Sequence, residues 1–170
     1  MKTHGEWVNM SASRQRRLKV MANTYSQVYL HFVFSTKKRA ETISPDIEER
    51  IWSYIAGVAK RHGMTPIQIG GIETHVHALV GVPTTMSSSQ GAKALKGDSS
   101  YGIRREFQAV ADFGWQDGYG VFSVSHSAIS SVADYIKNQR EHHSKRSFEE
   151  EYVGLLKKHG VDYDERYLFD

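Results

Sequence analysis

The sequence IETHVHALVGVP, residues 72–83, alternates in a way that predicts a β-strand over residues 74–82. Side chains two positions apart on a strand point to the same face of its sheet. His75 and His77 should therefore project together, while the intervening apolar residues face a buried side. The proline at the end of the stretch lacks a backbone donor and suits a strand terminus.

The segments on either side of this strand predict three further strands and two helices. Alternating apolar residues predict further strands over residues 28–34, 65–69 and 119–125, with a turn near Gly70 and Gly71. A helix capped by Ser44 and ended by Gly63 should precede the second strand. A weaker helical region over residues 87–107, broken near Gly97, should precede the fourth.

The order of these elements predicts the fold. Strand, helix, strand, strand, helix, strand is the split β-α-β pattern of a ferredoxin-like α+β sandwich, with a four-stranded antiparallel sheet and helices on one face. C-terminal helices should follow, one capped by Ser125 or Ser127 and one over residues 148–159 with a Ser147–Glu150 capping box. We expect the second face of the sheet to be open to a ligand or partner.

The composition excludes several classes of protein. A length of 170 residues predicts one domain with tails. The absence of cysteine excludes disulfides, zinc–thiolate sites and cysteine nucleophiles. The sequence has no apolar run long enough to cross a membrane and no secretory signal, so we expect a cytoplasmic protein without a membrane partner.

The net charge of +3 comes from the N-terminal segment. Residues 1–20 hold five basic residues and one acidic residue, whereas the rest of the chain has 17 basic and 18 acidic residues. Bulk charge therefore gives no argument for nucleic-acid binding by the body of the protein. We expect residues 1–21 to form a basic arm, either disordered, partly helical near residues 14–20, or upstream of a native start, and residues 22–170 to form the domain.

Two residue pairs could carry chemistry. Two neutral imidazoles on one strand face can bind a divalent metal ion, although His75 and His77 do not complete a site alone. Tyr135 and Gln139 are four residues apart on the expected helix and should share one face. A phenol oxygen can attack phosphorus, and an amide oxygen can bind magnesium or manganese. Each pair alone is also typical of ordinary structural residues.

Together, the His-x-His strand and the downstream Tyr-x-x-x-Gln helix resemble the single-tyrosine HUH transposases of the insertion-sequence-200 type. Other segments of the chain agree with this resemblance in the same order. These are YSQVYLHFVFSTKK at residues 25–38, the strand at residues 72–83, GWQDGYGVFSVS at residues 114–125, YIKNQREHH at residues 135–143, and the end of the chain from residue 148 to 170.

The resemblance implies a DNA transposase that cleaves and rejoins single-stranded DNA with hairpin ends. It implies that Tyr135 is the nucleophile, that a 5′-phosphotyrosine link forms, and that His75, His77 and Gln139 hold magnesium or manganese. It also implies a homodimer in which the nucleophile helix can serve the histidine pair of the partner subunit. The covalent link conserves bond energy, and the sequence has no phosphate-binding Gly-rich loop with Lys, so no nucleotide cofactor is expected.

Other residues and functions remain open. His31, His142 and His143 could lie near the site, although packing or helix-dipole roles are favoured for them. A non-catalytic or domesticated nucleic-acid-binding protein on the same fold is one alternative, and a metal-dependent hydrolase without a covalent step is another. Candidates for phosphate contacts, each also explicable as a solvated surface charge, are Lys37, Lys38, Arg39, Lys93, Lys96, Arg104 and Arg105.

Overall fold

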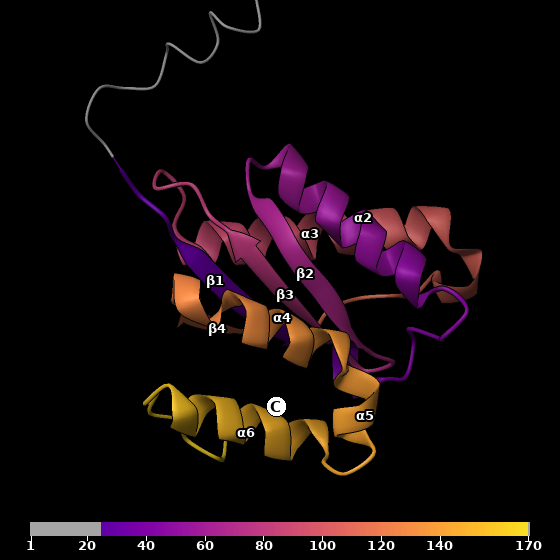
Figure 1. Cartoon of the computed structure of the whole chain (residues 1–170). Coiled ribbons are helices and arrows are strands. Elements are labelled where there is room, and N and C mark those ends of the chain that lie inside the picture. The colour runs from indigo at the N-terminus through magenta and orange to yellow at the C-terminus, as the bar shows by residue number, and fades with distance from the viewer. Residues whose placement is uncertain (1–24, 170) are drawn as a thin grey trace, which may run out of the picture.

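A four-stranded antiparallel sheet lies at the centre of the structure, a computed structural model that describes residues 25–169 (Figure 1). The strands are β1 (Tyr29–Ser35), β2 (Thr65–Ile72), β3 (His75–Gly81) and β4 (Gly120–Val124). Their order in the sheet is β2-β3-β1-β4, and every neighbouring pair is antiparallel. This confirms the ferredoxin-like sandwich. The expected basic arm at residues 1–21 lies outside the described residues.

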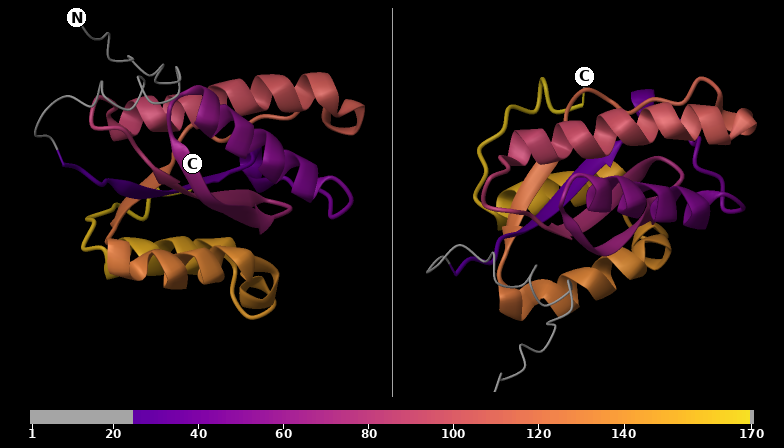
Figure 2. Two further views of the ribbon diagram at one scale, coloured as in Figure 1. Left: turned by 45° about the horizontal axis from the view of Figure 1, so that its top comes forward. Right: turned by 90° about the horizontal axis from the view of Figure 1, so that it is seen from above.

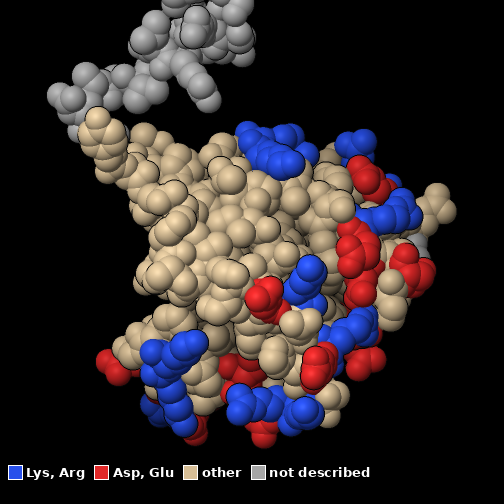
Figure 3. All heavy atoms as spheres, viewed as in Figure 1, with Lys and Arg blue, Asp and Glu red and all other residues tan. Residues whose placement is uncertain are grey.

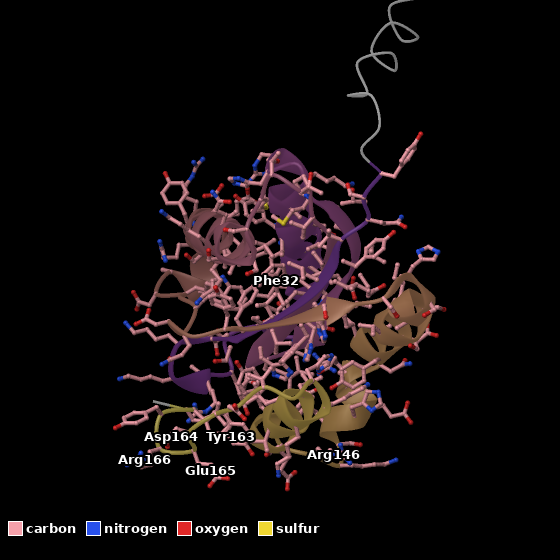
Figure 4. All side chains as sticks on the ribbon, turned by 90° about the vertical axis from the view of Figure 1, so that its left-hand side faces the viewer. Phe32, Arg146, Tyr163, Asp164, Glu165 and Arg166 are labelled. Atoms are coloured by element: carbon pink, nitrogen blue, oxygen red, sulfur yellow. The ribbon has the colours of Figure 1, made fainter. Side chains whose placement is uncertain are left out.

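One face of the sheet packs against α2 (Glu48–Arg61) and α3 (Ser88–Glu106). The apolar stripe expected on α2 is buried there, together with the apolar side chains of β1 and β3. Phe32 of β1 lies in the middle of this core (Figure 4). The helix begins later than expected, because Ser44 does not cap it but instead accepts backbone hydrogen bonds from Ile47 and Glu48 in a preceding turn.

The break expected in α3 near Gly97 is wrong, since the helix is continuous from Ser88 to Glu106. Glycine inside a helix costs about 1 kcal/mol relative to alanine. A capping box between Ser87 and Gln90 and the burial of Leu95 and Ile103 offset that cost. Packing therefore overrides the local preference of this segment.

The expectation of an open second face is also wrong. Three further helices cover it: α4 (Ile129–Lys137), α5 (Gln139–His143) and α6 (Phe148–Lys158). Figure 2 shows the sheet between two layers of helices, with α4, α5 and α6 on the side opposite α2 and α3. The Ser147–Glu150 capping box of α6 is confirmed, whereas neither Ser125 nor Ser127 caps α4 with its side chain. In the described part of the chain, residues 25–169, the remaining helical elements are the short 3-10 turns η2 (Lys37–Arg39), η3 (Gln108–Val110) and η4 (His126–Ala128).

One glycine of β2, Gly70, lets α4 approach the sheet. The β2–β3 turn lies at residues 73–74 rather than at Gly70 and Gly71, which are paired with β3. A Cβ atom on Gly70 would lie 2.8 Å from the backbone oxygen of Ile136 in α4. The bare backbone is therefore needed for close helix–sheet packing.

We expect Gly70→Ala to destabilise the protein by about 1–3 kcal/mol, because the added methyl group must push α4 away from β2. Thermal or urea unfolding followed by circular dichroism measures this loss. Gly97→Ala is the matched control, because a Cβ atom there meets nothing within 4 Å. The packing argument is wrong if both substitutions change stability in the same way.

Within residues 25–169, no helix combines the length and the hydropathy that crossing a bilayer requires.

Candidate active site

His75 and His77 lie on β3 and face the layer of C-terminal helices. Both are fully buried, with an exposed fraction of 0%. The intervening Val76 and Ala78 point into the core on the opposite face of the sheet. The alternation expected from the sequence is therefore confirmed. The sequence did not indicate that α4, α5 and α6 bury both histidines.

Glu151 of α6 connects the residues of this site. Its Oε2 atom lies 3.4 Å from Nε2 of His75 and 3.5 Å from Nε2 of His77. The same oxygen lies 2.8 Å from Nε2 of His143, on α5. A buried carboxylate is costly unless it is paired and hydrogen-bonded, and these three imidazoles provide partners.

Tyr135 and Gln139 contact the other oxygen of the same carboxylate. The helix that carries them is interrupted for one residue at Asn138, so Tyr135 ends up in α4 and Gln139 begins α5. The Tyr135 hydroxyl donates a hydrogen bond to Oε1 of Glu151, and Nε2 of Gln139 donates to the same atom over 2.9 Å. This orientation leaves Oε1 of Gln139 facing Nε2 of His75, 3.2 Å away.

Burial sets the protonation of these groups. It lowers the pKa of His75 to about 4, which leaves the ring neutral with a nitrogen lone pair. Burial and the hydrogen bond to Glu151 raise the pKa of the Tyr135 phenol well above its usual value. Burial opposes ionisation of Glu151, but the hydrogen bond with His143 and the close approach of His75 and His77 outweigh it and hold the pKa of the carboxyl far below its usual range.

His77 has one ring nitrogen engaged and the other free. Its Nδ1 atom lies 2.9 Å from Nε2 of His31, which is itself buried on β1. Burial, followed by the neighbouring His77, keeps the pKa of His31 well below its usual value. Among the described residues, Nε2 of His77 is the buried side-chain atom that lacks a hydrogen-bond partner. A buried polar atom without a partner is rare and points to a missing ligand.

The donor set around this nitrogen fits a divalent cation. Nε2 of His75 lies 3.2 Å from Oε1 of Gln139, and Oε2 of Glu151 lies 3.4 Å from the same nitrogen and 3.5 Å from Nε2 of His77. His75, His143 and Glu151 also place possible ligand atoms within 4.8 Å of one another. Mixed nitrogen and oxygen donors are compatible with cations of the manganese kind.

Arg140 fixes α5 over the hairpin that carries the histidines. Its guanidinium lies 2.9 Å from a carboxylate oxygen of Glu73, in the β2–β3 turn, and 2.5 Å from one of Glu48, at the start of α2. The adjacent Gln139 is buried at 1% exposure. This ion pair therefore helps to hold the amide against His75.

The structure brings together all four of the residues singled out from the sequence, namely Tyr135, His75, His77 and Gln139. Glu151 was not anticipated, although one signal was available. It lies three residues after Phe148 and four before Leu155, so it is an acidic residue on the apolar side of α6. His31 and His143, for which other roles were favoured, also contact the cluster.

The seven basic residues expected to contact DNA lie elsewhere. None of them borders the cavities beside Tyr135. Lys37 and Arg104 line a separate cavity of about 490 Å³ next to η3. Lys96 donates to the backbone oxygens of Asp117 and Gly118, and Arg39 pairs with Glu149 over 3.0 Å. A role of Lys37, Lys38, Arg39, Lys93, Lys96, Arg104 and Arg105 in DNA contact stays a prediction.

Solved structures with this arrangement of strands and helices include transposases. A candidate transposase from Deinococcus radiodurans superposes with a TM-score of 0.57 at 22% identity, covering 71% of this chain and 96% of that one. A REP-associated tyrosine transposase bound to a REP hairpin superposes with a TM-score of 0.51 at 12% identity, covering 72% of this chain and 73% of that one. At these identities, the likeness establishes a shared fold.

Sequence comparison establishes the family. The family model described as "Transposase IS200 like" matches residues 24–139, which include the histidine pair, the tyrosine and the glutamine. The transposases for insertion sequence element IS200 from Salmonella typhimurium and Salmonella typhi are each 26% identical over 129 residues, covering 72% of this chain and 84% of theirs. The chain belongs to the IS200-like transposase family.

Proposed function

We propose that the protein cleaves and rejoins single-stranded DNA, with Tyr135 as the nucleophile and a magnesium or manganese ion held by His75, His77 and Gln139. Membership of the IS200-like family supports this proposal. The observation that carries it is the convergence on Glu151, where the phenol contacts one carboxylate oxygen and the two histidines approach the other. A nucleophile beside a set of metal ligands is what metal-assisted phosphoryl transfer requires.

We include Glu151 among the residues that would hold the cation. Its Oε2 atom lies within 3.5 Å of Nε2 of both histidines, and Nε2 of His77 has no hydrogen-bond partner among the described residues. The amide of Gln139 is oriented by its bond to Glu151, so that its oxygen rather than its nitrogen faces the centre. A bound divalent cation would polarise the scissile phosphate and stabilise the charge that grows on its oxygens.

Glu151 also orients the Tyr135 hydroxyl. Burial keeps the phenol protonated until it reacts. Oε1 of Glu151 accepts the hydrogen bond from that hydroxyl and so orients the phenol, and the proton passes to solvent as the oxygen attacks, because the low pKa of this carboxyl makes it a weak base. Tyr135 itself is only half-buried, which leaves the nucleophile within reach of a strand of DNA.

The covalent steps balance without an external energy source. The Tyr135 oxygen forms a bond to phosphorus while the bond from phosphorus to the 3′ oxygen breaks, and that oxygen leaves as a hydroxyl after taking up a proton. The 5′ end then remains on Tyr135 as a phosphodiester. A 3′ hydroxyl of another strand end attacks this link in reverse and restores the tyrosine, so no nucleotide cofactor is consumed.

His31 acts as a positioning residue in this proposal. Nε2 of His77 can bind a cation only when the ring proton sits on Nδ1. Nδ1 then donates to Nε2 of His31, and this bond fixes both the tautomer and the orientation of the ring. Partners of this kind tune metal-binding histidines in many proteins.

We expect His31→Phe to weaken manganese binding about 10–100-fold, since the acceptor for Nδ1 of His77 is lost. His31→Gln keeps an acceptor oxygen near the same place and should lie closer to the wild type. Isothermal titration with manganese measures the affinities, and ¹⁵N NMR of the His77 ring reports its tautomer. Unchanged affinity and tautomer in His31→Phe would exclude the positioning role.

DNA hairpins at the ends of the substrate and a homodimer belong to the same proposal. The solved relative bound to a REP hairpin supports the first of these. The described chain places its own Tyr135 beside its own histidines, with ring centroids of Tyr135 and His77 5.8 Å apart. Exchange of the nucleophile helix between two subunits stays a prediction.

Overlapping single-stranded oligonucleotides that cover both strands of the DNA flanking the gene test the function directly. The protein, incubated with manganese and this set, should form a covalent adduct on one or a few members, and tandem mass spectrometry should locate it on Tyr135. Binding without cleavage would favour the non-catalytic nucleic-acid-binding protein. Cleavage that leaves free ends and no adduct would favour the metal-dependent hydrolase.

A further inference from the structure

Two cavities flank Tyr135. The larger, of about 710 Å³, lies between α4 and α6, and its floor includes His31 of β1 and Ser123 of β4. The smaller, of about 420 Å³, is lined by residues of α5 and of the turn that leads to α6. Both volumes lie in the range of about 300–1,000 Å³ that is usual for small-molecule sites. The two cavities share three lining residues, which are Tyr135, Arg146 and Glu151.

Because it lines both cavities, the proposed nucleophile Tyr135 lies between them. A strand that is cut at Tyr135 has one nucleotide on each side of the reacting phosphate. A separate cavity on each side of the phenol matches that requirement. Arg146 borders both cavities, and it sits at the base of the molecule by α6 (Figure 4).

The chemistry of the larger cavity suits a nucleotide. Lys158 and Arg146 supply positive charge for phosphate, and the hydroxyls of Ser123 and Ser131 can accept or donate hydrogen bonds. Val132 and Leu155 give the apolar surface that a base or a sugar can cover. The surface over α5 and α6 carries charges of both signs, with basic side chains gathered where α6 ends (Figure 3). A local contact, rather than a broad basic patch, therefore has to attract the phosphate.

Gly154 of α6 is exposed and lines the larger cavity. A Cβ atom there would meet nothing within 4 Å, so a larger side chain can be introduced at this position. A bulky residue there would occupy part of the cavity and so tests whether the cavity is used.

We propose that the groove between α4 and α6 binds the single strand of DNA at the cleavage point, with Arg146 at the phosphate that Tyr135 attacks and Lys158 at a neighbouring phosphate in the larger cavity. This inference rests on the proposed function, because it places the substrate of the same site. It assigns the DNA path to α6, whereas the basic residues singled out from the sequence lie on other elements.

The neighbouring lysines of α6 allow a matched test. Both lysines are exposed, but Lys158 lines the cavity and Lys157 does not. Binding of a fluorescein-labelled oligothymidylate is measured by fluorescence anisotropy at several salt concentrations, in a Tyr135→Phe background that blocks adduct formation. Lys158→Gln should weaken binding about threefold to tenfold and reduce the salt slope by about one, and Lys157→Gln should have less than about a twofold effect. Equal effects of the two substitutions would overturn the proposal.

Gly154→Phe fills the cavity without adding charge. It should weaken oligothymidylate binding by at least about tenfold, because the strand loses its place between α4 and α6. Gly154→Ala, which is too small to fill the space, should bind as tightly as the parent protein. Circular dichroism establishes that both variants are folded, and the lysine pair decides the outcome if Gly154→Phe is not. A folded Gly154→Phe variant that binds normally would contradict the proposal.

The failure of this inference is distinguishable from failure of the proposed function. Suppose that the adduct forms at Tyr135 but Lys157→Gln and Lys158→Gln affect DNA binding equally. The proposed function would then be supported, and the proposed DNA-binding groove would be rejected. Suppose instead that Lys158→Gln weakens DNA binding more than Lys157→Gln, but no oligonucleotide from the flanking DNA forms an adduct. The proposed groove would then be supported, and the catalytic role of Tyr135 would be rejected.

Discussion

Tyr135→Phe should abolish the covalent protein–DNA adduct, with strand cleavage reduced by at least about 1,000-fold. Phenylalanine fills the same space but has no oxygen to attack phosphorus. The contacts of Glu151 with His75, His77 and His143 do not involve the phenol and should persist. Manganese and DNA binding should therefore remain close to those of the wild type. Denaturing gel electrophoresis of labelled DNA after incubation with manganese measures the adduct.

A suitable control is Tyr163→Phe, which makes the same chemical change in the C-terminal segment (Figure 4), at a residue that lines neither of the cavities beside Tyr135. This variant should form the adduct at the normal rate. The assignment of the nucleophile fails if Tyr135→Phe still becomes linked to DNA, and a second tyrosine would then have to be sought by mass spectrometry.

Glu151→Gln should have the second large effect, on two properties at once. The carboxylate supplies an oxygen next to Nε2 of both histidines, and it is also the acceptor for the Tyr135 hydroxyl. An amide keeps the shape but loses the charge, so manganese affinity should fall about 10–100-fold. Loss of the charged acceptor that orients the Tyr135 hydroxyl should slow adduct formation about 100-fold even at saturating manganese.

Calorimetric titration with manganese and single-turnover adduct formation separate these two effects. Glu165→Gln, which removes one negative charge from the exposed C-terminal segment, should change neither of them. If Glu151→Gln binds manganese and reacts like the wild type, Glu151 only packs beneath the helices and has no part in the chemistry.

The sheet and the site residues on it could be predicted from local patterns. The alternation around His75 and His77 determines which face each side chain takes, and the spacing of Tyr135 and Gln139 brings them to the same side. The site survives the interruption at Asn138 because both residues still reach Glu151. These features depend on a few neighbouring residues, which is why sequence periodicity reveals them.

The features that the sequence did not indicate depend on tertiary packing. Glu149, Glu150 and Glu151 all look like acidic residues favoured in the first turn of α6. The sequence predicts that Glu150 caps the helix, but only the docking of α6 on the sheet decides that Glu149 pairs with Arg39 and that Glu151 enters the site.

The prediction of a turn near Gly70 and Gly71 was wrong because the position of the turn, too, depends on tertiary packing. Glycine pairs usually indicate a turn, whereas here the absence of a side chain serves the approach of α4 to β2. The contact between α4 and β2 also explains why the second sheet face is covered. Because α4 packs on this face, α5 and α6, which follow it in the chain, lie on the same face. Neither requirement can be read from residues close to Gly70 in the chain.

Anomalous diffraction at the manganese edge, from crystals grown with manganese, tests most directly whether one cation site joins the histidine strand to the nucleophile helix. We predict a single strong peak bounded by Nε2 of His75, Nε2 of His77 and the side-chain oxygens of Gln139 and Glu151, next to the Tyr135 hydroxyl. A peak elsewhere, or well-ordered crystals with manganese present and no density among these four side chains, would contradict this site and the reaction proposed for it.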